Sequence, residues 1–412
     1  MNADTGQILL EKNMHVPRKP ASITKIMTAM LALETGGPDA SVSVSNEAVA
    51  ANPSDGSSAG LTPGEIIPLE EILYAVMLES ANEAANAVAE YVSGSMEDFA
   101  VYMTRRAKEL GAENTRFANA NGLNHDDHYT SAYDMALITA EAIKNPRFLT
   151  IWGTYQHVMP PTNLQVSHRI LNNKNRMLPQ GAMPYEGILG GKTGFTTASG
   201  NTLVESASRD GRTLLCVLMQ GLSAQANFQD AALLLDYGFD CFRPVAYEDD
   251  GYTEAFTFLL HNDLSLGQVA VTTGSPTLNP DGSISVDFTF KAPSGSADLM
   301  YSSIASATLT TPVPPQPVPM SGLQADESAA LIPLQPQSRF ARALSGLSGL
   351  LCLLPGWLTG LIKAVLGLVA ALFALACVFR TRRWYRRRKR RLRKQQMEIR
   401  RRTYREQQSF WS

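Results

Sequence analysis

Four stretches in the first half of the chain carry apolar residues at the three- and four-residue spacing of a helix. The first follows Pro20, which suits a first helical turn, and its apolar stripe is Ile23, Ile26, Met27 and Met30. The other three cover residues 69–78, 83–91 and 131–143, and Ser131 opens the last of them with a capping-box pattern. The sequence therefore predicts a helical layer here.

The pattern changes to that of strands between residues 187 and 222. Two apolar runs, at 187–195 and 213–222, are separated by the hairpin-like turn sequence Ala-Ser-Arg-Asp-Gly-Arg. A closing helix is predicted at 231–237. Near the start, a turn at residues 4–6 precedes the apolar run 8–10, which we interpret as the second arm of a β-hairpin whose first arm lies outside the sequence. We therefore expect a truncated amino terminus.

Past Pro244 the composition changes to that of a small all-β domain. Strict alternation places Ile284, Val286, Phe288 and Phe290 on one face of a strand, after an Asn-Pro-Asp-Gly turn at 279–282. Proline-rich residues 311–320 predict an extended linker. The predicted divisions are a catalytic domain at 1–243, the β domain at 244–310, the linker at 311–342, a membrane-associated segment at 343–379 and a basic tail at 380–412.

Residues 358–379 form an apolar run long enough to cross a bilayer as one transmembrane helix. Its single charge, Lys363, lies near one end, and Trp357 marks that end as interfacial. The arginine-rich stretch 380–394 follows the other end, and the positive-inside rule places it in the cytoplasm. We predict a cell-membrane protein with an extracytoplasmic catalytic domain. If the shorter apolar run 344–354 also crossed, the body would lie on the side of the tail.

An exported body needs an amino-terminal signal, and the sequence begins without one. We expect that the start is missing rather than that the body stays inside the cell.

The net charge of −2 hides a segregation of signs. From Phe340 onward there are 17 Lys and Arg against 2 Asp and Glu, which leaves 19 against 36 in the rest of the chain. Beside a membrane helix, such a tail is interpreted as resting on anionic lipid headgroups rather than binding nucleic acid. The four cysteines are too few for a disulfide framework, although Cys216 and Cys241 could pair.

Three short motifs follow one another along the chain. Ser22 and Lys25 form Ser-x-x-Lys at a helix start, Ser80 and Asn82 form Ser-x-Asn between two helices, and Lys192-Thr193-Gly194 lies on a strand. Each is weak alone, because Ser-x-x-Lys occurs by chance in a chain of this length. A second Ser-x-Asn, at 199–201, is assigned to turn chemistry, since it closely follows Lys-Thr-Gly and cannot form an opposite cleft wall.

In this order and context the motifs resemble those of the penicillin-recognising serine acyltransferases. The flanking sequences at 4–13, 20–34, 79–94, 119–138 and 187–212 are similar to the D-alanyl-D-alanine carboxypeptidases, over about residues 2–242 and more loosely through the β domain. The resemblance implies a transpeptidase-like α/β (α+β) fold, a helix–antiparallel sheet–helix sandwich. It also implies a serine carboxypeptidase that removes the terminal D-alanine of peptidoglycan stem peptides without a cofactor, with β-lactams as covalent inhibitors.

A serine hydroxyl is a poor nucleophile until a neighbour takes its proton, and only a neutral lysine can do so. Burial and a second cation, for which Lys192 is the candidate, would lower the pKa of Lys25. The family implies that Ser80 relays the proton, Asn82 binds the substrate peptide, and Lys192 and Thr193 hold its terminal carboxylate.

By the same resemblance, the backbone N–H groups of Ser22 and Phe195 form an oxyanion hole. Gly194 is expected to let the strand approach the substrate closely.

Two other classes of function stay open at this point. A β-lactamase would need a carboxylate that activates water for deacylation, and the sequence shows no clear motif for one. A membrane-bound β-lactam sensor would fit the membrane helix and tail, although the tail is short for an effector domain. The run His125-Asp126-Asp127-His128 resembles a metal pair without an evident third ligand, so no metal site is predicted.

Overall fold

The computed structural model describes residues 1–37, 39–247, 256–265, 269–275, 277–278, 284–291 and 303–311. The helices in chain order are a 3₁₀ turn η1 (Ala21–Thr24), α1 (Lys25–Thr35), α2 (Asn46–Ala50), α3 (Leu69–Tyr74), a π-helical turn η2 (Ala75–Glu79), α4 (Asn82–Ser93), α5 (Met96–Glu109), α6 (Ala132–Ala142), α7 (Pro146–Trp152) and α8 (Ala224–Asp240).

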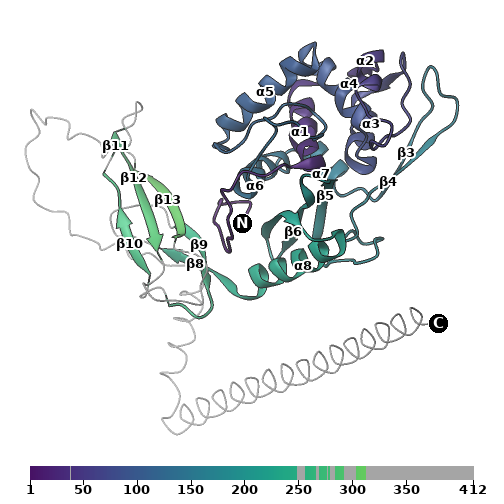
Figure 1. Ribbon diagram of the computed structural model, residues 1–412. Helices are drawn as coiled ribbons and strands as arrows, with labels where there is room; N and C mark the ends of the chain where they lie inside the picture. The colour runs from purple at the N-terminus through teal and green to yellow at the C-terminus, as the bar shows by residue number, and fades with distance from the viewer. Residues whose placement is uncertain are drawn as a thin grey trace, which may run out of the picture. The chain divides into compact units, whose positions relative to one another are not determined.

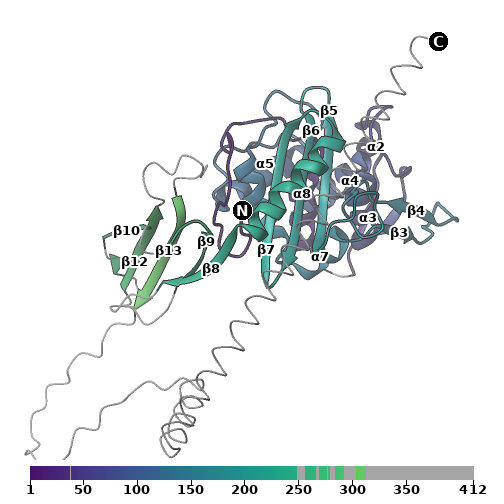
Figure 2. The ribbon, with the colours of Figure 1, turned by 90° about the horizontal axis from the view of Figure 1, so that it is seen from below.

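An antiparallel sheet forms the middle layer, in the order β5-β6-β7. Its strands are β5 (Ile188–Thr196), β6 (Gly200–Arg209) and β7 (Arg212–Gly221). Helix α8 packs on one face, and Figure 2 shows it in front of the strands with the remaining helices behind them. A helix–antiparallel sheet–helix sandwich was predicted, and this arrangement confirms it. Strand β5 lies at one edge of this sheet within the described part of the chain.

Helix α1 is the central element of the helical layer (Figure 1). Every residue from Lys25 to Leu33 is buried, because α4, α5, α6 and α7 all contact this helix. The predicted apolar stripe therefore understates its burial, and α1 reads as a fully enclosed core helix. A polar side chain on such a helix has no water to bind, so Lys25 depends on partners from the protein.

Two smaller antiparallel pairs precede the central sheet in the chain. They are β1 (Ser41–Ser43) with β2 (Ile66–Pro68), and β3 (Gln156–Met159) with β4 (Arg169–Asn172). Between them, the bidentate ion pair of Arg169 with Glu65 joins β4 to the start of β2, at 2.6 Å and 2.9 Å. Glu65 is fully buried and also accepts from Thr62 and Thr162.

Several predicted elements are confirmed and others need correction. The helix expected at 83–91 is α4, and Ser131 caps α6 by accepting from the Asp134 N–H. The helix expected at 69–78 changes from α3 into the π-helical η2 midway. The strand expected at 8–10 is wrong, because the pairing there falls on Asn2, which forms an isolated bridge with Leu214 of β7.

The region after residue 241 contains further strands: β8 (Phe242–Tyr247), β9 (Phe256–His261), β10 (Ala270–Thr273), β11 (Thr277–Leu278), β12 (Ile284–Lys291) and β13 (Ser303–Thr311). Strand β12 pairs with β10, β11 and β13, and its Val286, Phe288 and Phe290 are buried, as the alternation predicts. Because residues Met1–Pro317 form one compact unit, the boundary at 243/244 stays a prediction.

The linker, the membrane-associated segment with its predicted helix at 358–379, and the basic tail lie outside the described residues. Among the residues that the structure describes, none of the helices combines the length and apolar character that a membrane crossing needs.

Candidate functional site

The turn that carries Ser22 is held in an unusual backbone conformation. Ala21, immediately before it, has φ of 51°, a left-handed value that costs energy in a residue with a side chain. Gly122 backs this turn so closely that a Cβ there would lie 2.0 Å from the Ala21 carbonyl oxygen. Thr202 of β6 also donates to the Pro20 carbonyl at 2.8 Å. Ser22 is thus positioned from both sides by tight contacts.

Lys25 lies one turn after Ser22, at the start of α1, and is fully buried. Its Nζ is 3.2 Å from Ser22 Oγ, 2.8 Å from Asn82 Oδ1 and 2.6 Å from the Asn121 carbonyl oxygen. These three oxygens surround the amine, so it is ordered by hydrogen bonds, and no carboxylate of the described residues contacts it directly. The geometry places the amine within hydrogen-bonding reach of the serine hydroxyl.

Ser80 projects from the break between η2 and α4. Its φ of 62° ends the π-helical turn, and π-helical insertions are frequent at functional sites. Lys192 Nζ, from β5, donates to Ser80 Oγ at 3.0 Å and to the Thr193 carbonyl at 3.0 Å. This contact joins the helical wall to the sheet wall of the same cleft.

The pKa values of the two lysines are lowered by burial and by the positive charges of neighbouring lysines. Burial lowers the pKa of Lys25 well below its usual value, and Lys192 and then Lys174 lower it further, whereas Glu83 raises it. Burial, together with Lys174, lowers the pKa of Lys192 to about 7. Lys25 is therefore suited to hold a neutral amine, the form that accepts a proton.

The cleft between these walls has a volume of about 720 Å³. Ser22, Ser80, Asn82, Thr193, Gly194 and Phe195 all line it. A Cβ on Gly194 would lie 2.8 Å from the Ser22 backbone nitrogen and 2.4 Å from Thr202 Oγ1, so β5 approaches the serine as closely as its backbone allows. Phe195 is 64% exposed at the rim. Six of the eight predicted site residues thus line one cleft, and the buried Lys25 and Lys192 are hydrogen-bonded to residues that line it.

Comparison with known proteins agrees with this geometry. Residues 1–223, more than half of the chain, match the D-alanyl-D-alanine carboxypeptidase family. The chain belongs to that family. It is 35% identical over 239 residues to the D-alanyl-D-alanine carboxypeptidase DacF of Bacillus subtilis, a match that covers 57% of this chain and 60% of that protein. The chain therefore spans less than two thirds of the length of that relative.

Two further comparisons extend the likeness. The D-alanyl-D-alanine carboxypeptidase DacB2 of Mycobacterium tuberculosis is 31% identical over 241 residues, 57% of this chain and 79% of that protein. The crystal structure of penicillin binding protein 6B from Escherichia coli superposes with a TM-score of 0.58 at 25% identity, over 76% of this chain and 93% of that one. The transpeptidase-like fold is thus shared with this solved penicillin-binding protein.

Sequence reasoning missed three contributors to this family site. The Asn121 carbonyl binds Lys25, Lys174 acts on both buried lysines, and Asn52 binds Asn82. Lys174 and Asn52 lie in polar loops without periodicity or motif, so no sequence signal marks them. Asn121 acts through its backbone, which any residue type would supply.

The His-Asp-Asp-His run has a structural role at His128. Because His128 Nδ1 accepts from the Ala118 N–H, its Nε2 donates to Thr24 Oγ1 at 2.8 Å, beneath the Ser22–Lys25 turn. Burial lowers the pKa of His128 to about 3, so the ring stays neutral. No group of metal-binding side chains occurs in the described ranges.

At the second Ser-x-Asn, Ser199 exchanges hydrogen bonds with Thr196, which is the turn chemistry expected there.

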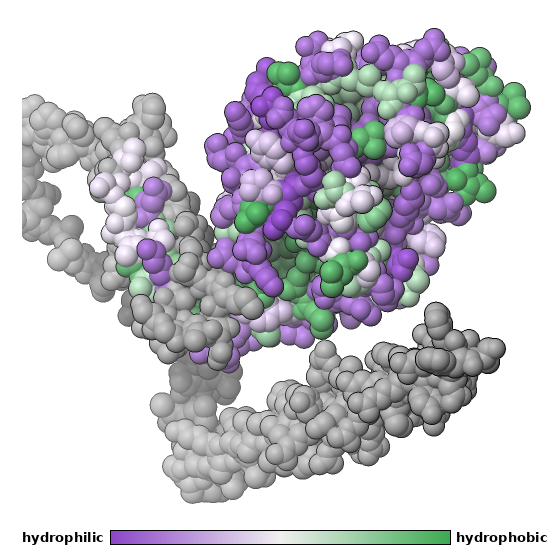
Figure 3. Space-filling model, viewed as in Figure 1, coloured by the Kyte–Doolittle hydropathy of each residue, from purple (hydrophilic) through white to green (hydrophobic). Residues whose placement is uncertain are grey.

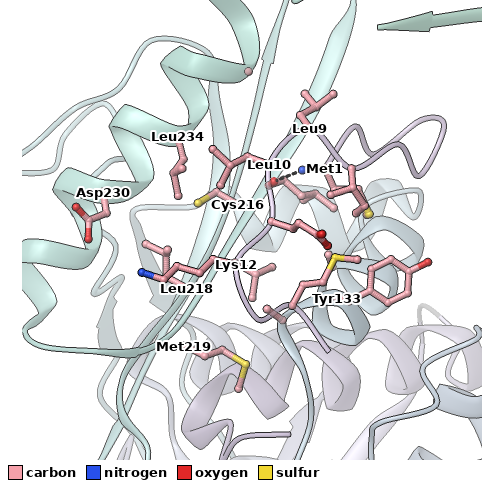
Figure 4. A pocket seen from close by; sticks show the side chains of 18 of the residues that line it. Met1, Leu9, Leu10, Lys12, Tyr133, Cys216, Leu218, Met219, Asp230 and Leu234 are labelled. Atoms are coloured by element: carbon pink, nitrogen blue, oxygen red, sulfur yellow. Dashed lines mark hydrogen bonds between the residues drawn. The ribbon is translucent and has the colours of Figure 1, made fainter. Parts of the chain in front are cut away.

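A second hollow, of about 620 Å³, lies between β7, α8 and residues 8–14, and none of the predicted site residues lines it. Apolar side chains dominate this hollow (Figures 3 and 4). In Figure 4 the dashed line joins the Met1 amine to the Leu215 carbonyl, at 2.9 Å. Burial raises the pKa of the nearby Cys216 thiol to about 12, which leaves it unreactive.

Proposed function

We propose that this chain is a serine-type D-Ala-D-Ala carboxypeptidase that removes the terminal D-alanine of peptidoglycan stem peptides and is acylated by β-lactams. The observation that carries the proposal is the fully buried Lys25 amine, 3.2 Å from Ser22 Oγ, with its pKa lowered by burial and two further lysines. Membership of the carboxypeptidase family supports the choice of substrate.

In the proposed acylation, Lys25 takes the proton of Ser22 while Oγ attacks the carbonyl carbon of the scissile peptide bond. The oxyanion accepts hydrogen bonds from the backbone N–H groups of Ser22 and Phe195. Collapse of the tetrahedral intermediate breaks the C–N bond, and Ser80 relays to the leaving nitrogen the proton that Lys25 took from Ser22. Water then hydrolyses the ester on Ser22 and restores the hydroxyl.

Substrate binding is assigned to the remaining cleft residues. Asn82 has one amide hydrogen free of its contact with Asn52 and would donate it to the substrate backbone. Lys192, whose Nζ lies beside Ser80, and Thr193, which lines the cleft, would bind the terminal carboxylate. Gly194 would allow the substrate backbone to lie against β5. A substrate without a free carboxyl terminus would lose these charge-assisted bonds.

The test compares the wild type with Ser22→Ala after incubation with benzylpenicillin, by intact mass, and measures D-alanine release from a D-Ala-D-Ala peptide. We expect one added penicillin and D-alanine release for the wild type, and neither for the variant. Rapid penicillin turnover without D-alanine release would instead indicate a β-lactamase. A lasting adduct without D-alanine release would indicate a β-lactam sensor.

We also propose that residues 358–379 and the basic tail hold the protein to anionic membrane lipids, with the catalytic part outside the cytoplasm. The apolar run and the 17 cationic residues after Phe340 support this. Extraction of cell membranes at alkaline pH tests it. The full chain should stay in the membrane fraction, and a chain ending at residue 342 should be released; release of both would contradict the proposal.

A further inference from the structure

The orientation of the Asn82 side-chain amide matters to Lys25, because the two ends of an amide have opposite hydrogen-bonding roles. Asn82 Oδ1 accepts from Lys25 Nζ at 2.8 Å, and Asn82 Nδ2 donates to Asn52 Oδ1 at 2.9 Å. If the amide were turned by half a rotation, a donor would face Lys25 instead. A second group must therefore keep the oxygen toward the lysine.

That second group is the amide of Asn52, which is itself fixed by acceptors. Asn52 Nδ2 donates to Glu83 Oε2 at 3.1 Å and to the Ser57 carbonyl at 3.2 Å. The other Glu83 oxygen accepts from Ser58 Oγ and the Ala59 N–H, both at 2.7 Å. Since carboxylate and carbonyl oxygens can only accept, Asn52 must direct its nitrogen to them and its oxygen to Asn82.

The chain of amides determines where the lone pair of a neutral Lys25 points. A neutral amine has two N–H bonds and one lone pair, and three oxygens surround it. Asn82 Oδ1 and the Asn121 carbonyl can only accept, so they take both N–H bonds. The lone pair is left for Ser22 Oγ, the one neighbour that has a proton to give.

We propose that Asn52 and Glu83 are positioning residues that aim the lone pair of Lys25 at Ser22 by locking the amide of Asn82. This inference rests on the proposed function, in which Lys25 is the base. The loop that carries Gly56 packs directly against the contact between Asn52 and Asn82. A Cβ on Gly56 would lie 2.0 Å from Asn52 Oδ1 and 2.9 Å from Asn82 Nδ2.

If Glu83 acted on Lys25 through its charge alone, its removal would change the acylation rate differently from loss of the hydrogen-bond chain. The two explanations can therefore be separated by experiment. The charged groups that act on Lys25 are Lys192 from β5, Lys174 from the loop before β5, and Glu83 from α4. Removing the Glu83 charge lowers the pKa of Lys25 and increases the neutral fraction, which would preserve the reaction rate at high pH. If the Asn82 amide is no longer held in place, the acylation rate falls at every pH instead. The reason is that the N–H donor of Asn82 then competes with Ser22 for the lone pair of Lys25.

The experiment measures the rate of Ser22 acylation by benzylpenicillin between about pH 5 and pH 10 in the full chain. In Glu83→Gln the new amide nitrogen faces Asn52 Nδ2, donor against donor. In Asn52→Asp the new carboxylate lies against the carboxylate of Glu83. We expect the high-pH plateau of each single variant to fall by about tenfold or more. In the double variant the carboxylate at 52 accepts from both amides, and the plateau should recover by about fivefold over either single variant.

Glu90→Gln is the matched control, since it removes the same charge from the same helix and contacts Ser45 rather than the amide chain. It should acylate like the wild type. Plateaus of the single variants within about threefold of the wild type, or a double variant no faster than the slower single one, would overturn the proposal. If Glu83→Gln does not fold, Asn52→Ala at the partly exposed position replaces it. Its plateau should fall by about fivefold, as the loss of one hydrogen bond predicts, and an unchanged plateau would overturn the proposal. Failure of the proposed function would appear separately, as a wild type that benzylpenicillin does not acylate.

Discussion

Gly122 lies outside all three motifs, yet the structure makes it a sensitive test of how Ser22 is positioned. Its φ is +90°, and a Cβ would lie 2.0 Å from the Ala21 carbonyl oxygen, 2.4 Å from the carbonyl carbon and 3.0 Å from the Ser22 nitrogen. All three atoms are backbone, so no side-chain rotation relieves the overlap. In Gly122→Ala the serine turn must therefore move by about 1 Å to restore ordinary contact.

Two costs combine in this variant. The left-handed backbone costs about 1–2 kcal/mol in a residue with a side chain. The overlap adds about 1–3 kcal/mol, as overpacking does in protein cores. We expect a total loss of about 3 kcal/mol in the free energy of unfolding. Misplacing a reacting group by about 1 Å costs roughly 100-fold in rate, so acylation of Ser22 should slow by about that factor.

Gly111→Ala is the matched control. Gly111 has φ of +82°, and the nearest atom to its added Cβ would be Leu137 Cδ1 at 3.8 Å, so it carries the backbone cost without the overlap. Urea unfolding followed by circular dichroism and the rate of penicillin acylation would be measured for both variants. If Gly122→Ala acylated within about threefold of Gly111→Ala, the reasoning that this contact positions Ser22 would be refuted.

Three further predictions concern charge. Lys174→Met removes a charge that lowers the pKa of Lys25 and Lys192, so the acidic limb of the acylation rate should move to higher pH; an unmoved limb in stopped-flow profiles contradicts this. Arg169→Met leaves the buried Glu65 carboxylate without its guanidinium and should cost about 3 kcal/mol in urea unfolding, whereas a loss below about 1 kcal/mol would argue against the pair. Lys192 has a pKa of about 7 when folded against 10.5 ordinarily, so the unfolded state binds the extra proton in between. The stability of the wild type relative to Lys192→Met should therefore rise from about pH 7 to pH 10 in urea unfolding series, and a constant difference would contradict the shift.

The sequence predicted the residues of the candidate site better than the residues that hold them in position. Ser22, Lys25, Ser80 and Lys192 belong to motifs in which side-chain type and spacing carry the chemistry, and the structure brings them into one cleft. Periodicity likewise located α1, α4, α6, β5 and β7, because the burial of one face imposes it, but it missed α5 and β6, the middle strand of the central sheet. The sandwich arrangement itself was implied by the family resemblance of the motifs and not by periodicity.

What the sequence could not predict depends on contacts between distant loops. Asn52 and Lys174 reach the cleft from irregular segments, where neither periodicity nor spacing constrains the residue type. The π-helical turn before Ser80 has no signature that distinguishes it from the end of α3. The burial of α1 on all sides was also hidden, because the number of neighbours a helix acquires depends on the whole topology.

The place of β5 at the edge of the central sheet has a consequence for selectivity. An edge strand presents unpaired amide groups, and Thr193, Gly194 and Phe195 of this strand line the cleft. A peptide that binds along the edge of β5 would be recognised through hydrogen bonds to its own main chain, as an added β-strand is. We expect such an enzyme to be indifferent to many changes in the body of the stem and strict about its last two residues.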